Sequence, residues 1–256
     1  MSSDHTSSES QAFYVGYLPL PSPHKRFVAG LLSLLVVGMI GMGALIASTQ
    51  RSPGKTAVVS VEMGTWSGTV YNEPYPMMIH DDGSIHLLMG MGKFSVADTA
   101  AEFEGLRCEV DGWALDRSNR RAIQLDMSDT ALRAVSGKVQ PKPIESAASG
   151  SIELIGEIVD GKCFLGMMKP GDGKTHKACA TLCIEGGLPP MFASASQSES
   201  GQLPLVLVDG STELPSGVLE LVGEPVQITG QLSMFGTLPI LRMNTGSVQR
   251  WNGKSP

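Results

Sequence analysis

EFEGLRCEVDGWALDRSNRRAIQLD, from Glu102 to Asp126, and ELVGEPVQITGQLSMFGTLPILRMN, from Glu220 to Asn244, are the two stretches that decide the expected fold. Each contains two runs of alternating apolar and polar residues joined by a short hairpin, which is the pattern of half-buried strands. The two stretches lie in different halves of the chain, so the sequence predicts a structural repeat.

Shorter strands upstream extend the repeat. WSGTV, Trp66–Val70, corresponds to IGEIV, Ile155–Val159, and HLLMG, His86–Gly90, corresponds to LVLVDG, Leu205–Gly210. Because the order strand, strand, hairpin occurs twice, we expect a mainly β fold with two small OB-like or Greek-key barrels.

A segment rich in Ser, Pro, Gly and Ala, VSGKVQPKPIESAASGS, separates the halves. This composition is typical of a linker. We therefore expect a first β domain at 56–134, a linker at 135–151 and a second β domain at 152–252, which carries a Cys/His insertion.

An uncharged stretch, FVAGLLSLLVVGMIGMGALIAS, occupies 27–48. A helix of about 22 residues spans the hydrocarbon core of a bilayer. A cleaved signal peptide would have a shorter apolar core and a small-x-small site at its end. We therefore predict an uncleaved transmembrane helix at 27–48, preceded by a disordered, Ser-rich cytoplasmic tail at 1–26.

The basic residues beside this segment do not decide its orientation. Lys25 and Arg26 precede it and Arg51 and Lys55 follow it, so the positive-inside count ties. Long domains are translocated largely regardless of charge, and clustered cysteines suit an oxidising compartment. We expect an inner (plasma) membrane protein whose N-terminus is cytoplasmic and whose C-terminal domains are periplasmic.

Charge and motifs limit the possible partners. The formal net charge is −6, with no basic stripe, which argues against nucleic acid. GDGKT, 171–175, resembles the end of a phosphate loop, but Met168 stands where that loop needs its first glycine. We expect no nucleotide. The expected partners are the membrane and a membrane protein or complex, and the absence of a Ser/His/Asp nucleophile pattern favours a non-enzymatic role.

The most reactive residues lie in GEIVDGKCFLGMMKPGDGKTHKACATLCIEGGLPP, 156–190. His176, Cys179 and Cys183 are three and four residues apart, so in a helix they would share one face. Cys163 closes the preceding strand-like run, and the Gly/Pro-rich loop can bring it close. Three thiolates and an imidazole can ligate zinc, and they also suit copper. The candidate metal ligands are Cys163, His176, Cys179 and Cys183.

Two other interpretations of the cysteines remain open. Outside the cytosol, Cys163 paired with Cys179 or Cys183 would form a disulfide staple in a structural subunit of a membrane assembly. A thiol enzyme or copper chaperone using Cys179 and Cys183 is the third, although a disulfide between neighbouring turns of one helix is geometrically awkward.

A second group of soft ligands lies in PYPMMIHDDGSIHLLMGMGK, 74–93. It contains four methionines and two histidines: Met77, Met78, Met89, Met91, His80 and His86. Such residues can bind copper, but methionines at strand spacing usually fill a core. We expect core packing here, and a buried thiol at Cys108.

The stretch 156–192 also resembles a motif of uncharacterised bacterial membrane-anchored envelope proteins. The shared elements are a GEIVDxKC strand, an HxxCAxxC helix and a GGxPP turn, and they cover about 35 residues. The resemblance implies an envelope protein with an OB-like C-terminal domain and supplies no activity. It carries over the four candidate ligands and the turn residues Gly186, Gly187 and Pro189.

Overall fold

A computed structural model describes residues 22–49, 60–117, 120–148, 150–194 and 204–253. The chain divides into two compact units, Met1–Gly54 and Lys55–Pro256, and each unit is described by itself. The predictions for the tail at 1–21 and for Arg51 and Lys55 lie outside the described residues.

The first unit contains one helix, α1 (Ser22–Thr49). Pro23 stands in its first turn, where a missing backbone N–H breaks no helical hydrogen bond. The part from His24 to Ser48 is 25 residues long and apolar, which gives a length of about 37 Å and is enough to cross a membrane. The predicted apolar helix is confirmed, with a start five residues earlier than expected.

The first barrel is built from residues 60–134. Its elements are β1 (Ser60–Tyr71), β2 (Met77–Ile79), β3 (Ile85–Met89), α2 (Ala97–Glu102), β4 (Arg107–Arg117), β5 (Arg120–Leu125) and β6 (Leu132–Ala134). The strand order is β1-β2-β3-β5-β4, and pairing between β4 and β1 closes the ring. Neighbouring strands pair antiparallel except β3 and β5, which are parallel. β6 pairs with the N-terminal part of β4, at Cys108–Val110.

The second barrel repeats this topology. Its strands are β7 (Ser151–Asp160), β8 (Pro190–Ser194), β9 (Leu205–Val208), β10 (Pro225–Phe235) and β11 (Leu238–Arg250), with α4 (Ser216–Leu219) before β10. Here β9 and β11 form the parallel pair, and β10 with β7 closes the ring. The prediction of two small OB-like barrels is confirmed, whereas the short strands β2, β6 and β8 were not predicted.

Glycines at corresponding positions of the two barrels let the first strand lie very close to the second. A Cβ on Gly68 of β1 would lie 2.5 Å from the Ile79 carbonyl oxygen of β2. A Cβ on Gly156 of β7 would lie 2.2 Å from the Ala193 oxygen of β8. In both barrels the first strand approaches the second more closely than any side chain allows, which lets these short barrels curl shut.

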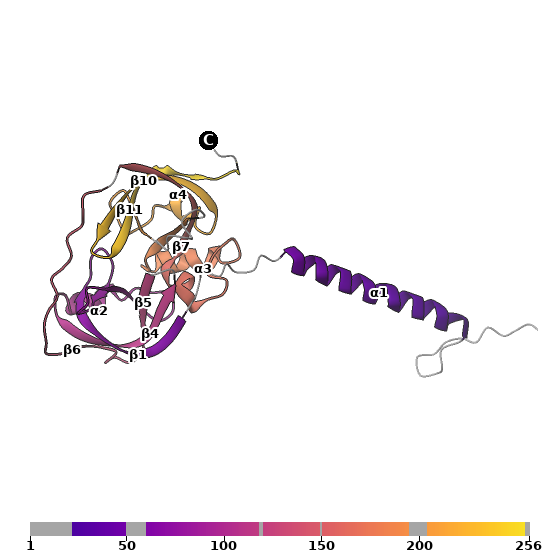
Figure 1. Cartoon of the computed structure of the whole chain (residues 1–256), viewed down its shortest axis with the longest axis horizontal. Coiled ribbons are helices and arrows are strands. Elements are labelled where there is room, and N and C mark those ends of the chain that lie inside the picture. Colours follow the sequence, from indigo (N-terminus) through magenta and orange to yellow (C-terminus); the bar gives the residue numbers. More distant parts are fainter. Residues whose placement is uncertain (1–21, 50–59, 118–119, 149, 195–203, 254–256) are drawn as a thin grey trace, which may run out of the picture. The chain divides into compact units, whose positions relative to one another are not determined.

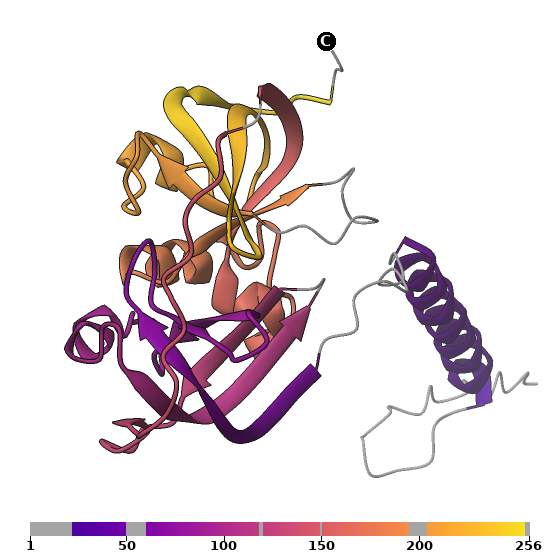
Figure 2. The same ribbon diagram turned by 60° about the vertical axis from the view of Figure 1, so that its left-hand side comes forward.

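The two barrels share a core. Each has its own interior cluster, and a third cluster joins outward-facing residues of both. In β3, Leu88 belongs to the interior cluster, while Ile85, Leu87 and Met89 belong to the shared one. This is why all five residues of β3 are buried. Figures 1 and 2 show the second barrel beside the first, with α3 between them.

The main difference between the barrels is the connection from the first strand to the second. In the first barrel it is 72–76, whereas in the second it spans 161–189 and contains a helical turn, η1 (Cys163–Met167), and a helix, α3 (Lys177–Glu185). Residues from both elements pack in the shared cluster, including Phe164, Leu165 and Cys183.

The segment expected to be a linker is fastened to both barrels. The Tyr71 hydroxyl donates to the Gln140 carbonyl oxygen over 2.7 Å. Further along, Glu145 pairs with Arg242 of β11 and forms a β-bridge with Phe235. The described part of this segment is therefore a strap along the two-barrel unit.

Candidate metal-binding thiol site

Three cysteines come together between the barrels. Cys179 and Cys183 lie one turn apart on α3, and Cys163 begins η1. Their Sγ atoms all lie within 4.8 Å of one another. We call Cys163, Cys179 and Cys183 the thiol triad. Cys163 and Cys183 are buried and Cys179 is partly buried.

Local geometry explains how the chain returns on itself. Cys163 was expected on a strand, but β7 ends at Asp160 and Cys163 lies in the turn that follows. Gly166, near the end of η1, has φ of 143°, a conformation that favours glycine and interrupts the helical backbone. The loop that follows leads into α3, which places Cys179 and Cys183 opposite Cys163.

The spacing of the triad suits a metal ion. With a zinc–sulfur bond of about 2.3 Å, tetrahedral geometry places ligand sulfurs about 3.8 Å apart. Sulfurs within 4.8 Å of one another therefore need only small adjustments to share an ion. All four cysteines are in the described part of the chain and all have free thiols, so the expected disulfide staple is not formed in this structure.

His176 lies in a different group from the other helix residues. It caps the N-terminus of α3, and its Nε2 atom is 3.0 Å from Oδ2 of Asp160. Both side chains are buried. Asp160, Cys163 and His176 form a second group with potential ligand atoms within 4.8 Å. The structure thus divides the four predicted ligands into two groups that share Cys163.

Asp160 is a site residue that the sequence did not single out. Its Oδ1 atom accepts the backbone N–H of Cys163 over 2.8 Å while Oδ2 contacts His176. One carboxylate therefore fixes both the cysteine and the histidine. The only signal for it in the sequence was its place at the end of the GEIVD strand.

Lys93 is the second residue that sequence reasoning missed. It follows β3 in the first barrel, and its Nζ atom lies 2.8 Å from Sγ of Cys179 and 3.8 Å from Sγ of Cys183. Lys162 ties the same loop down, since its Nζ donates to the carbonyl oxygens of Gly90 and Gly92 over 2.7 and 2.8 Å. The site is therefore completed by the other barrel.

The thiols share their protons unequally. A hydrogen bond from Cys163 lowers the pKa of the Cys183 thiol to about 7, and the positive charge of Lys93 acts in the same direction. The same hydrogen bond, together with burial, raises the pKa of Cys163. Of these two thiols, Cys183 therefore loses its proton first as the pH rises, and Cys163 keeps its proton. Ligation by all three sulfurs would release that proton.

The second group of soft ligands is mostly core, as expected. Met77, Met78 and Met89 are fully buried in the hydrophobic clusters. His80 and His86 stack edge to face with ring centroids 4.3 Å apart. Burial lowers the pKa of His86 to about 3, so this imidazole is neutral in the folded protein.

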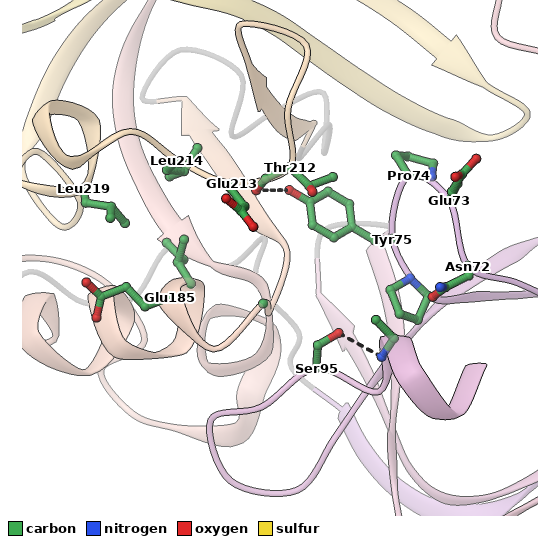
Figure 3. Close-up of a pocket in the computed structure, with 14 residues that line it drawn as sticks. Asn72, Glu73, Pro74, Tyr75, Ser95, Glu185, Thr212, Glu213, Leu214 and Leu219 are labelled. Atoms are coloured by element: carbon green, nitrogen blue, oxygen red, sulfur yellow. Dashed lines mark hydrogen bonds between the residues drawn. The ribbon is translucent and has the colours of Figure 1, made fainter. Parts of the chain in front are cut away.

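A separate cavity of about 610 Å³ lies between the barrels, close to the C-terminal end of α3. Figure 3 shows Glu213 and Thr212 on one side and Tyr75 on the other, with the Tyr75 hydroxyl bonded to the Thr212 oxygen over 3.1 Å. Among the described residues that line the cavity, Glu73, Glu185 and Glu213 carry carboxylates and none is Lys, Arg, His or Cys. This cavity therefore offers no thiol or imidazole to a metal ion.

The faces that OB-type barrels use for binding are covered here. Such barrels bind oligonucleotides and oligosaccharides across their second and third strands. In this chain the outward side chains of those strands, including Met77 and Leu87 in the first barrel and Met191 and Leu205 in the second, are buried in the shared cluster. The open face expected for ligand binding is absent from this part of both barrels.

The fold and the site together define a two-barrel protein with a buried thiol triad and an N-terminal apolar helix. Comparisons with protein-family models, curated proteins and solved structures give no match to this chain.

Proposed function

We propose that this chain is a membrane-anchored, exported accessory protein that binds a soft metal ion, zinc or copper, through the thiol triad. The observation that carries the proposal is the position of three Sγ atoms within 4.8 Å of one another in a largely buried site. Thiolates are the ligands that zinc and copper(I) prefer, and burial protects them from competing reactions.

The location belongs to the same proposal. The apolar helix at 24–48 supports a single membrane anchor. With the N-terminus in the cytoplasm, the two-barrel unit would lie in the periplasm, and a membrane-protein complex would be its partner. The resemblance to bacterial envelope proteins supports this placement. The proposed role is metal binding and requires no enzymatic reaction.

The His176–Asp160 pair would support metal binding by orienting the residues that hold the ion. A carboxylate that fixes a histidine and a neighbouring cysteine resembles the outer-shell groups that orient metal ligands. The ligand atoms of His176 lie within 4.8 Å of the Cys163 sulfur but not of all three sulfurs, so His176 is assigned to orienting the triad.

Metal analysis beside thiol counting tests the proposal. The full chain is purified in detergent, loaded with zinc or copper(I) under reducing conditions, and passed through a desalting column. We expect stoichiometric metal, with the triad protected from a thiol reagent until a chelator is added. Cys183→Ala should abolish retention, whereas Cys108→Ala, at a buried cysteine outside the triad, should retain it.

The competing function is a structural subunit whose cysteines form a staple. The closeness of the Sγ atoms suits this role too, and the shared core makes the two barrels a rigid unit. A protein that retains no metal and gains two free thiols on adding reductant would establish the staple and reject metal binding.

A further inference from the structure

Lys93 is built into the thiol triad from the opposite barrel. Besides its contacts with the sulfurs of Cys179 and Cys183, its Nζ atom lies 3.3 Å from the backbone oxygen of Cys179. Its loop is held on both sides, by the bonds from Lys162 to Gly90 and Gly92 and by the bond from the Ser95 N–H to the Gly186 oxygen over 2.8 Å. The backbone that carries Lys93 is thus held beside the triad, within reach of its sulfurs.

This placement limits the number of protein ligands. An ammonium group has three N–H donors and no lone pair to offer a metal. It lies beside Cys179 and Cys183, while His176 is held by Asp160 on the side of Cys163. An ion shared by all three sulfurs therefore has a three-sulfur set. Thiolates bind both zinc and copper(I), but structural zinc takes four protein ligands, which a three-sulfur set does not supply.

The charge of Lys93 acts in the same direction. An ion bound among the three sulfurs lies within a few ångströms of the ammonium, which itself is 2.8 and 3.8 Å from two of them. Coulomb repulsion scales with the charge of the ion, so a divalent cation is repelled twice as strongly as a monovalent one. The surrounding burial weakens screening of this difference.

We propose that Lys93 is a specificity-determining residue that makes the thiol triad a site for a monovalent soft cation, copper(I), in preference to zinc(II). This inference rests on the proposed metal binding. It assigns the ion class to the three-sulfur set and assigns to Lys93 the discrimination against divalent ions.

Lys93→Leu tests the inference, because leucine carries no charge and no atom that could ligate a metal. Affinities of the full chain in detergent for copper(I) and for zinc(II) are measured separately, under anaerobic reducing conditions, by competition with chelators of known affinity. We expect Lys93→Leu to raise zinc affinity about tenfold or more relative to copper(I) affinity. Lys169→Leu removes a charge at an exposed position of the insertion that carries the triad and should leave the ratio unchanged.

The outcomes separate this inference from the proposed function. Binding of neither metal to the wild-type protein would reject metal binding altogether. Metal binding with the same zinc-to-copper ratio in Lys93→Leu as in the wild type would leave that function standing and overturn the role of Lys93. Should Lys93→Leu fail to fold, Lys93→Gln, which also removes the charge, takes its place in the same comparison. X-ray absorption of the copper-loaded wild type checks the ligand set: three sulfur neighbours are expected, and a fourth nitrogen or oxygen ligand overturns the three-sulfur site.

Discussion

Gly186→Ala should push the Lys93 loop of the first barrel away from the C-terminal end of α3 and destabilise the folded protein. Gly186 follows α3, and a Cβ built on it would lie 1.8 Å from the Lys93 carbonyl oxygen. Its φ of −77° is open to alanine, so the effect is steric and involves no backbone strain. Because the obstacle is backbone, no side-chain rotation can relieve the clash.

The structure sets the size of the effect. Ordinary contact begins near 3.4 Å, so the Lys93 loop must move by about 1.6 Å. Such overpacking costs about 1–3 kcal/mol. A shift of this size also breaks the hydrogen bond from Ser95 to Gly186, which contributes about 1 kcal/mol. The expected loss of unfolding free energy is therefore about 2–4 kcal/mol.

Chemical denaturation followed by tryptophan fluorescence measures this loss in the full chain in detergent. Gly217→Ala is the matched control, because Gly217 lies in α4 with nothing within 4 Å of its Cβ position. Alanine there should leave stability unchanged or raise it by up to about 1 kcal/mol. If Gly186→Ala unfolds with the same free energy as the control, the close approach of the barrels at this point is refuted.

Three further predictions concern buried polar groups and the metal. Asp160→Ala should lower the unfolding free energy by about 2–6 kcal/mol, because the Cys163 N–H and the His176 ring both lose a buried acceptor. Asp160→Asn should lower it by less, and thermal melts of the two variants measure the difference. His86 is neutral when folded and has a pKa near 6.5 when unfolded, so its contribution is complete above pH 6.5 and falls as the pH drops toward 3. Between pH 7 and pH 5 the wild type should lose about 2 kcal/mol more than His86→Leu; equal losses would contradict the buried, neutral imidazole. Chelating the bound metal should lower the melting temperature, by the equivalent of about 4 kcal/mol at a metal concentration 1,000 times Kd, and should not affect Cys183→Ala.

The fold was predictable where its strands were long. The hairpins β4–β5 and β10–β11 alternate over many residues, so their pattern survives in the sequence and the repeat is visible. β2 and β8 are short, and β8 begins with proline, so periodicity gives little signal for either. β3 and β9, the strands that pair with them, were predicted. Because β3 and β9 are buried on both faces, their residues do not alternate between apolar and polar.

The site was predictable only where its residues are close in the chain. Helical spacing correctly brought Cys179 and Cys183 together, and the loop composition brought Cys163 to them. Lys93 is 86 residues away from Cys179 and belongs to the other barrel, so no local pattern could place it there. His176 lies with Asp160 and Cys163, apart from Cys179 and Cys183, because its contact with Asp160 is determined by the turn after β7 and not by the helical face.

The inserted connection at 161–189 helps to join the two barrels into one compact unit. The first barrel shows that five strands close with a connection of only 72–76 in the same place. The insertion therefore adds nothing that barrel closure requires, yet its apolar side chains, Phe164, Leu165 and Leu188, lie in the cluster common to both copies. Without the insertion, the two barrels would expose apolar surface where they face each other; with it, the boundary between them is a buried interior in which the thiols lie.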